Sequence, residues 1–259
     1  MKILKSAFIH LKSKNGFDAA AVLSFSTLFA IVPLFALVFS IFSLSPYFAD
    51  LQQYLDGFLF EQLLPKNHQL LSQYIHKFID SAQNLKGVSS LFLLLVVIFL
   101  FREVDGKINS IFGLEKTRHL GIGLLIYLLV LILGPLLLAL SLFISSYLNA
   151  SKLLAFAPIS GFFAATLPII LSAIGLALLY YFIPSTKISF KNAIKSGLIT
   201  AFFLEALKLL MLIYISYFPF YQLIYGALST LPLFMLWVYF SWILVLFGAS
   251  ISFCFHKQE

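Results

Sequence analysis

Glu205 and Lys208 are the only charged residues in a long apolar stretch, 199–214, which reads "ITAFFLEALKLLMLIY". They are three positions apart, so a helix would place them on one face. The carboxylate is on the N-terminal side, which is the better order for an intrahelical ion pair. Such a pair could bind the head of an amphiphile, or it could hold helices together. The residues alone leave both alternatives open.

The depth of this pair in a membrane follows from the nearest preceding charge. Glu205 lies ten residues after Lys195, which at a rise of 1.5 Å per residue is about 15 Å, close to the midplane. A lone charge there costs about 2.5–3.5 kcal/mol on insertion scales, so we expect the pair to face a helix bundle or a hydrated cavity. The candidate ligand-binding set also includes three charges that follow an earlier apolar stretch: Arg102, Glu103 and Asp105.

The composition is that of a polytopic membrane protein. Apolar residues make up 61% of the 259 positions and charged residues only 10%, whereas soluble domains have about 25% charged residues. The formal charge of +7 comes from short Lys and Arg runs between apolar segments, which favours charges at the inner membrane face over a nucleic-acid-binding stripe. Cys254 is the only cysteine, so an internal disulfide and a Cys-rich metal site are excluded. We predict no cofactor and no metal.

We predict an all-α fold with six transmembrane helices in a single integral-membrane domain, 1–259. The lengths and composition of the apolar runs fit a hydrocarbon core of about 30 Å. The first run, Ala19–Ala49, is too long for the apolar region of a signal peptide, so it is predicted to be an uncleaved span. The predicted spans are approximately 19–45, 86–104, 121–148, 158–183, 193–217 and 228–254.

The distribution of Lys and Arg predicts that both termini lie in the cytoplasm. The loop between spans 3 and 4 has only Lys152, and the turn between spans 5 and 6 has no basic residue. The cytoplasmic side of the membrane would carry the other basic residues, which are Lys2, Lys5, Lys12, Lys14, Arg102, Lys107, Lys116, Arg118, Lys187, Lys191 and Lys195.

Three amphipathic helices are predicted outside the spans. Apolar residues recur at helical spacing in 50–64 and again in 67–83, on the outer side between spans 1 and 2. These two helices could pack on the spans, or they could form a gate or a surface for a partner. Residues 2–12 form the third, with lysines beside an apolar face, which suits an anionic inner leaflet.

Catalytic motifs of soluble enzymes are absent from the sequence. It has no phosphate-binding glycine loop and no nucleophile elbow. Glu103 and Asp105 are two positions apart and do not face each other on a helix, which argues against a two-metal nuclease site. We therefore predict that the protein is not an enzyme. The small residues Ala173 and Ala177 predict a close contact with another helix.

Several segments resemble the YihY/BrkB family of bacterial inner-membrane proteins. They are "AAAVLSFSTLFAIVPLFALVFS" at 19–40, "INSIFG" at 108–113, "FFLEALKLLMLIYISYF" at 202–218 and "YGALSTLPLFMLWVYFSWILVLFGASI" at 225–251. The resemblance implies a six-helix fold in the bacterial inner membrane. It marks as family-type positions Glu205, Lys208, Tyr225, Gly226, Trp237 and Gly248.

The function favoured by the residues is a non-enzymatic one in the cell envelope, with membrane lipids as partners. Glu205 and Lys208 would hold a lipid or another amphiphile, which the protein would handle or transport. The alternative is a structural or assembly component that docks an envelope protein through the outer helices. A third reading is an enzyme, because members of the similar family were long labelled ribonuclease BN, but the residues give that label no support.

Overall fold

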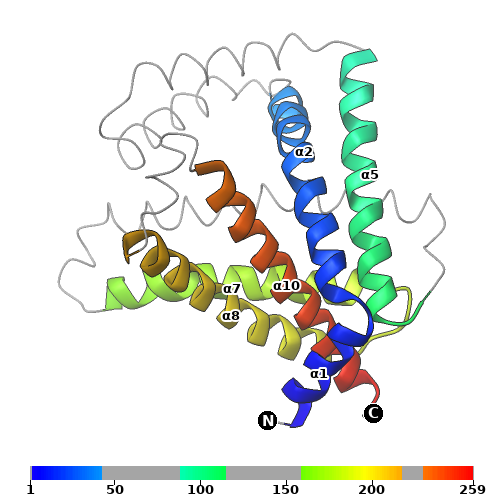
Figure 1. Cartoon of the computed structure of the whole chain (residues 1–259), viewed down its shortest axis with the longest axis vertical. Coiled ribbons are helices and arrows are strands. Elements are labelled where there is room, and N and C mark those ends of the chain that lie inside the picture. Colours follow the sequence, from blue (N-terminus) through cyan, green and yellow to red (C-terminus); the bar gives the residue numbers. More distant parts are fainter. Residues whose placement is uncertain (1, 43–87, 115–158, 218–229, 259) are drawn as a thin grey trace. The chain divides into compact units, whose positions relative to one another are not determined.

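The structure is a computed structural model that describes residues 2–42, 88–114, 159–217 and 230–258. The described residues form helices and contain no strand. Figure 1 shows the six helices, which are α1 (Lys2–Ser13), α2 (Gly16–Phe42), α5 (Val88–Ile111), α7 (Ile159–Phe182), α8 (Phe190–Tyr217) and α10 (Thr230–His256).

Five of the predicted spans and the N-terminal amphipathic segment correspond to these helices. The helix at the second predicted span, α5, continues beyond the predicted end at 104 to Ile111, so Arg102, Glu103 and Asp105 are helical. The predicted span 121–148 and the outer helices 50–64 and 67–83 lie outside the described residues.

Of the described helices, three have the length and composition needed to cross a membrane. The qualifying stretches are Gly16–Pro33, Phe190–Tyr214 and Pro232–His256, and a shorter apolar stretch is Ile169–Phe182. Since lipid offers no hydrogen-bond partner to backbone groups, a helix that satisfies these groups internally is the expected spanning element. The described part of the chain is therefore that of an all-helical membrane protein.

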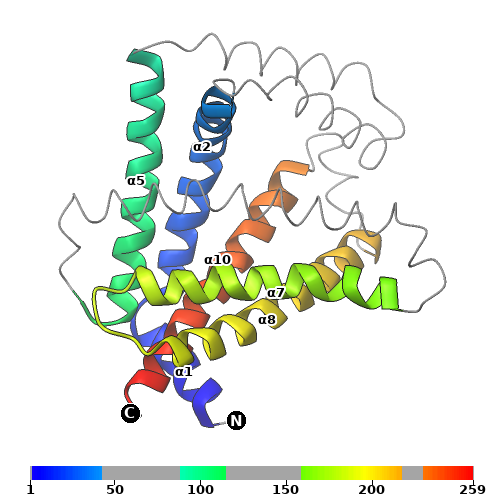
Figure 2. The ribbon, with the colours of Figure 1, turned by 180° about the vertical axis from the view of Figure 1, so that it is seen from behind.

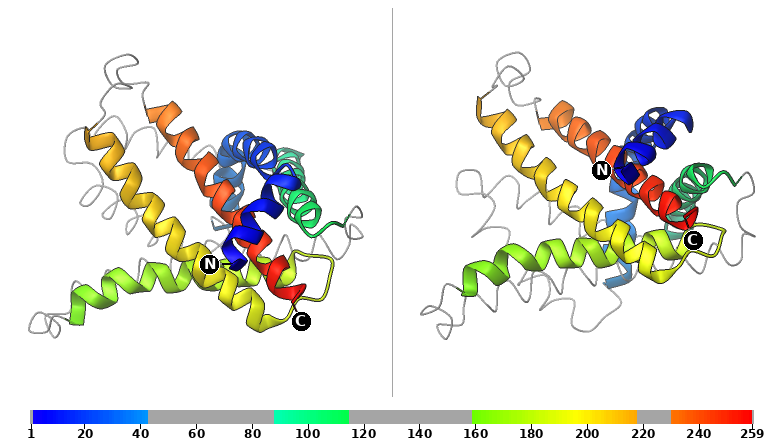
Figure 3. Two further views of the ribbon diagram at one scale, coloured as in Figure 1. Left: turned by 60° about the horizontal axis from the view of Figure 1, so that its bottom comes forward. Right: turned by 90° about the horizontal axis from the view of Figure 1, so that it is seen from below.

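The chain divides into two compact units, Met1–Phe25 with Phe101–Glu259, and Ser26–Leu100. The first unit contains α1, α7, α8, α10, the start of α2 and the end of α5. In this unit α8 packs along α7 on one side and contacts α10, which in turn contacts α1. Figure 2 shows α7 and α8 side by side, and Figure 3 shows α1 across the C-terminal part of α10.

The contact between α7 and α8 depends on small residues. A Cβ atom at Gly197 would lie 2.6 Å from the Ala173 carbonyl oxygen and 2.8 Å from the Ala177 nitrogen. Both distances are too short for a side chain, so Gly197 brings the two backbones into direct contact. The predicted close approach at Ala173 and Ala177 is thus present, with Gly197 as its partner.

Tyr180 joins α7 to both neighbouring helices. Its side chain is completely buried, and its hydroxyl donates a hydrogen bond of 2.9 Å to the Val245 carbonyl oxygen of α10. The same hydroxyl lies 3.3 Å from Thr200 Oγ1 of α8. Gly248 follows Val245 by three positions, and a Cβ there would collide with the Tyr180 hydroxyl and Thr200 Oγ1. The missing side chain at Gly248 leaves the space that the tyrosine occupies.

Gly248→Ala is expected to destabilise the protein by about 1–3 kcal/mol, since the added methyl group must displace a buried hydroxyl. The measurement is thermal unfolding of the purified full-length protein in detergent. Gly175→Ala is the matched control, because a Cβ at Gly175 of α7 meets nothing within 4 Å. An unchanged unfolding temperature for Gly248→Ala would contradict this description of the three-helix contact.

Candidate functional site

Glu205 and Lys208 form an ion pair within α8. Lys208 Nζ donates a hydrogen bond of 2.6 Å to Glu205 Oε1. The lysine side chain is 46% exposed and the glutamate side chain 27% exposed. The two groups therefore pair with each other between positions i and i+3, and both remain accessible at the helix surface.

The surroundings of this pair are apolar and open. Within the spanning stretch Phe190–Tyr214, Glu205 lies fifteen positions after the start, which corresponds to about 22 Å along the helix. The leucines that follow, Leu209 and Leu210, are exposed, as is Phe202 one turn before. The ion pair thus lies beside exposed apolar side chains of the same helix, where an unpaired charge is costly.

The charges at the end of α5 have other partners. Glu103 Oε1 lies 3.4 Å from Lys107 Nζ, one turn along the same helix. Asp105 is buried, at 3% exposure, and its Oδ1 accepts a hydrogen bond of 3.1 Å from Asn109 Nδ2. Arg102 is exposed. Within the described residues, neither Glu205 nor Lys208 is hydrogen-bonded to these three predicted members of the set.

Asn109 connects α5 to the loop between α7 and α8. Its Nδ2 donates to the Asp105 carbonyl oxygen at 2.9 Å and is 3.4 Å from the Ile183 carbonyl oxygen. Its Oδ1 accepts a hydrogen bond of 2.7 Å from the backbone nitrogen of Ser185. One buried amide therefore satisfies backbone groups on two segments that are more than 70 positions apart in the chain.

His10 makes the corresponding connection for α1. Its Nε2 lies 2.8 Å from the Ile111 carbonyl oxygen at the end of α5, so Nε2 carries the donated proton. The ring stacks on Phe253 of α10, with centroids 4.3 Å apart and planes inclined by 9°. The N-terminal helix is thereby fixed to two helices from distant parts of the sequence.

The sequence analysis did not single out a buried polar row on α8. Asn192, Ser196 and Thr200 are four positions apart and all are buried. Ser196 Oγ donates to the Asn192 carbonyl oxygen and Thr200 Oγ1 to the Ser196 carbonyl oxygen, each at 2.8 Å. Their regular spacing is visible in the sequence and places them on one face of a helix. This signal could have predicted the face of α8 that is turned to the interior.

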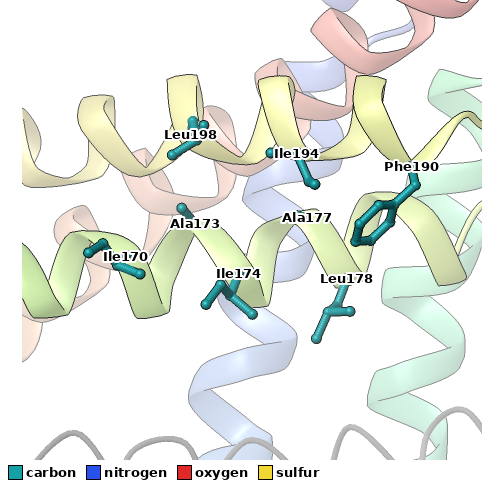
Figure 4. Close-up of a pocket in the computed structure, with 8 residues that line it drawn as sticks. All are labelled: Ile170, Ala173, Ile174, Ala177, Leu178, Phe190, Ile194 and Leu198. Carbon is teal, nitrogen blue, oxygen red and sulfur yellow. The ribbon is translucent and has the colours of Figure 1, made fainter.

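Two apolar grooves lie beside α8. One has a volume of about 200 Å³ between α7 and α8, where Ile170, Ile174 and Leu198 line it together with Phe190 (Figure 4). The other has a volume of about 450 Å³ and lies between α1, α8 and the end of α10. Grooves of this apolar character fit hydrocarbon chains better than polar substrates.

Among the described residues there is no cluster of three or more His, Cys, Asp or Glu side chains that could hold a metal ion. Cys254 is a buried free thiol, and its Sγ lies 3.8 Å from Ser6 Oγ. The thiol therefore takes part in the packing of α10 against α1.

The comparison with protein families settles the family of the chain. The family model described as "Virulence factor BrkB" matches residues 7–259. The chain belongs to the BrkB family. No solved structure matches it.

Relatives of this BrkB-family chain are named as membrane proteins. A "UPF0761 membrane protein" from Pseudoalteromonas translucida is 36% identical over 245 residues, which cover 93% of this chain and 81% of the relative. Another from Aggregatibacter aphrophilus is 37% identical, covering 91% of this chain and 85% of the relative. A third from Pseudomonas paraeruginosa is 34% identical over 96% of this chain, but the chain spans only 60% of that relative's length.

The family-type positions lie in different environments in this BrkB-family chain. Gly248 is buried against Tyr180 and Thr200. Trp237 is 38% exposed, with its ring centroid 6.0 Å from that of Phe234. Tyr225 and Gly226 lie outside the described residues.

Asn109→Ala is expected to lower the stability of the folded protein by about 0.5–1.5 kcal/mol, because it removes a buried amide and leaves the Ser185 backbone nitrogen without its acceptor. Thermal unfolding in detergent measures this loss. Ser110→Ala changes the exposed neighbouring position and should have little effect. Equal unfolding temperatures for the two variants would show that the amide does not connect α5 to the α7–α8 loop.

Proposed function

We propose that this BrkB-family membrane protein binds a lipid or another amphiphile at Glu205 and Lys208, as part of a non-enzymatic function in the cell envelope. The observation that carries the proposal is an accessible ion pair within a membrane-length helix. The proposal places the protein in the bacterial inner membrane with both termini in the cytoplasm.

The exposure of the pair supports a binding role over a purely structural one. A pair that holds two helices together gains most when both groups are enclosed between them and fully hydrogen-bonded. Here Lys208 is nearly half exposed, and it donates a hydrogen bond to Glu205 of its own helix. An ammonium has three donors and a carboxylate two oxygens, so the hydrogen bond between Lys208 Nζ and Glu205 Oε1 does not use all the groups with which the pair could contact a ligand.

The chemistry of the pair suits a zwitterionic lipid headgroup, which carries one positive and one negative charge. Lys208 can donate to a phosphate oxygen, while Glu205 can accept from an amine, since both groups are ionised and adjacent. The exposed apolar side chains on either side, Phe202 and Leu209, would contact the hydrocarbon tails. Binding would exchange the intrahelical pair for two pairs with the ligand, so that charge is never left uncompensated in the membrane.

Native mass spectrometry with lipid identification tests this proposal on full-length protein extracted gently from its own membrane. We expect the wild-type protein to retain a lipid that Glu205→Leu/Lys208→Leu loses. The double substitution removes both charges together and leaves no unpaired group in the membrane, so folding and insertion should persist. Thermal unfolding of both proteins checks that the variant is folded.

The matched control is Lys12→Leu/Asp18→Leu, which removes one charge of each sign at two exposed positions near the N-terminus. This variant should retain the wild-type lipid. The proposal is wrong if the folded Glu205→Leu/Lys208→Leu protein carries the same lipids as the wild type, because the ion pair would then act within α8 alone.

A further inference from the structure

The groove between α1, α8 and the end of α10 is lined by apolar side chains and has a lysine of α8 beside it. Its volume is about 450 Å³, within the range of roughly 300–1,000 Å³ that is typical of ligand sites. Its lining is almost entirely apolar and comes from all three helices: Ile3, Leu4, Leu198, Ile199, Phe202, Phe203 and Phe255.

Two lysines on α8 lead into this groove. Lys191, Lys195 and Ile199 follow one another at intervals of four residues, and Phe202 follows three positions later, so these side chains lie along one face of the helix. Lys195 Nζ is 5.3 Å from the ring centroid of Phe255, which lines the groove. The ammonium group is therefore at the groove itself.

The charge at this end of α8 is uncompensated within the described residues. Lys191 and Lys195 are exposed, and neither makes an ion pair with a described carboxylate. The helix α1 contributes Lys2 and Lys5 beside the lining residues Ile3 and Leu4, and it has no acidic residue. On α8 no acidic residue precedes Glu205. The positive end of the α8 dipole adds to the same potential.

The order of charge and hydrocarbon along α8 matches that of a phospholipid in a leaflet. From Lys195 to Phe202 the helix rises about 10 Å, from the first turns of the spanning stretch into its apolar part. A phosphate at the lysines would place an acyl chain along Ile199 and Phe202. Phe202 is 66% exposed, so it offers an open side of the groove to a chain entering from the bilayer.

We propose that this groove is a binding site for an anionic glycerophospholipid from the adjacent leaflet, with its phosphate at Lys191 and Lys195 and an acyl chain along Ile199 and Phe202. The positive charge selects an anionic over a zwitterionic headgroup. The site uses other residues than Glu205 and Lys208, and it does not rest on the proposed function of that pair.

The test is a titration of purified full-length protein in detergent with dioleoyl phosphatidylglycerol or dioleoyl phosphatidylcholine, with bound lipid counted by native mass spectrometry. The wild-type protein should bind the anionic lipid about tenfold more tightly. Lys191→Gln/Lys195→Gln should abolish this preference, whereas Lys12→Gln/Lys14→Gln, with the same loss of charge elsewhere, should keep it. Equal binding of the two lipids by the wild type, or an unchanged preference in Lys191→Gln/Lys195→Gln, would overturn the assignment.

The acyl-chain part of the site is tested separately. Phe202→Ser should weaken binding of both lipids, and Ile213→Ser is its control, since Ile213 is also exposed on α8 but does not line the groove. Equal effects of the two substitutions would overturn the acyl-chain placement.

Two further measurements identify which residues bind the phosphate. Glycerol 3-phosphate, which has no acyl chains, should not displace the bound phosphatidylglycerol. Displacement would mean that the site binds only the headgroup. Glu205→Leu/Lys208→Leu should retain the anionic preference. Loss of the preference in that folded variant would move the site to the ion pair and overturn the assignment to the groove.

Discussion

The hydroxyl group of Tyr180 is the point at which α7, α8 and α10 are joined. It donates to the Val245 carbonyl oxygen and lies against Thr200 Oγ1, and it reaches both because Gly248 has no side chain to occupy that space. In a membrane the hydrophobic effect does not drive helices together, so close packing and hydrogen bonds between helices must do so. A buried hydroxyl without a partner would be costly there, which makes this contact specific for one arrangement of the three helices.

The arrangement around Tyr180 gives α8 two different sides. Its small and polar residues, Gly197 and Thr200 among them, contact the neighbouring helices. The ion pair of Glu205 and Lys208 and the side chains of Phe202 and Leu209 are left accessible. A helix fixed on one side by hydrogen bonds and close contacts can present charged groups to the membrane on the other without reorienting to hide them. Both proposed lipid contacts depend on this division of α8.

Asn109 and His10 also join segments that are far apart in the sequence. Each is a polar side chain that donates to a backbone carbonyl oxygen on a distant segment. Together they attach α1 and the end of α5 to the α7–α8 loop and α10. The groove that we assign to an anionic lipid exists because α1 is held across α10 beside α8. The position of a short N-terminal helix thus decides whether the lysines of α8 have an apolar groove beside them.

The sequence by itself determined the helical membrane class, the bounds of α2, α7, α8 and α10 to within a few residues, and the position of Glu205 and Lys208 on one face of a helix. These follow from local properties, namely the length of apolar runs and the 3.6-residue period of a helix. The roles of Asp105, Asn109 and Tyr180 and the reason for a glycine at 248 were decided only by the tertiary structure. Each depends on which residue of another helix lies opposite. Periodicity along one helix carries no information about that neighbour, and so the grooves and buried hydrogen bonds could not be read from the chain alone.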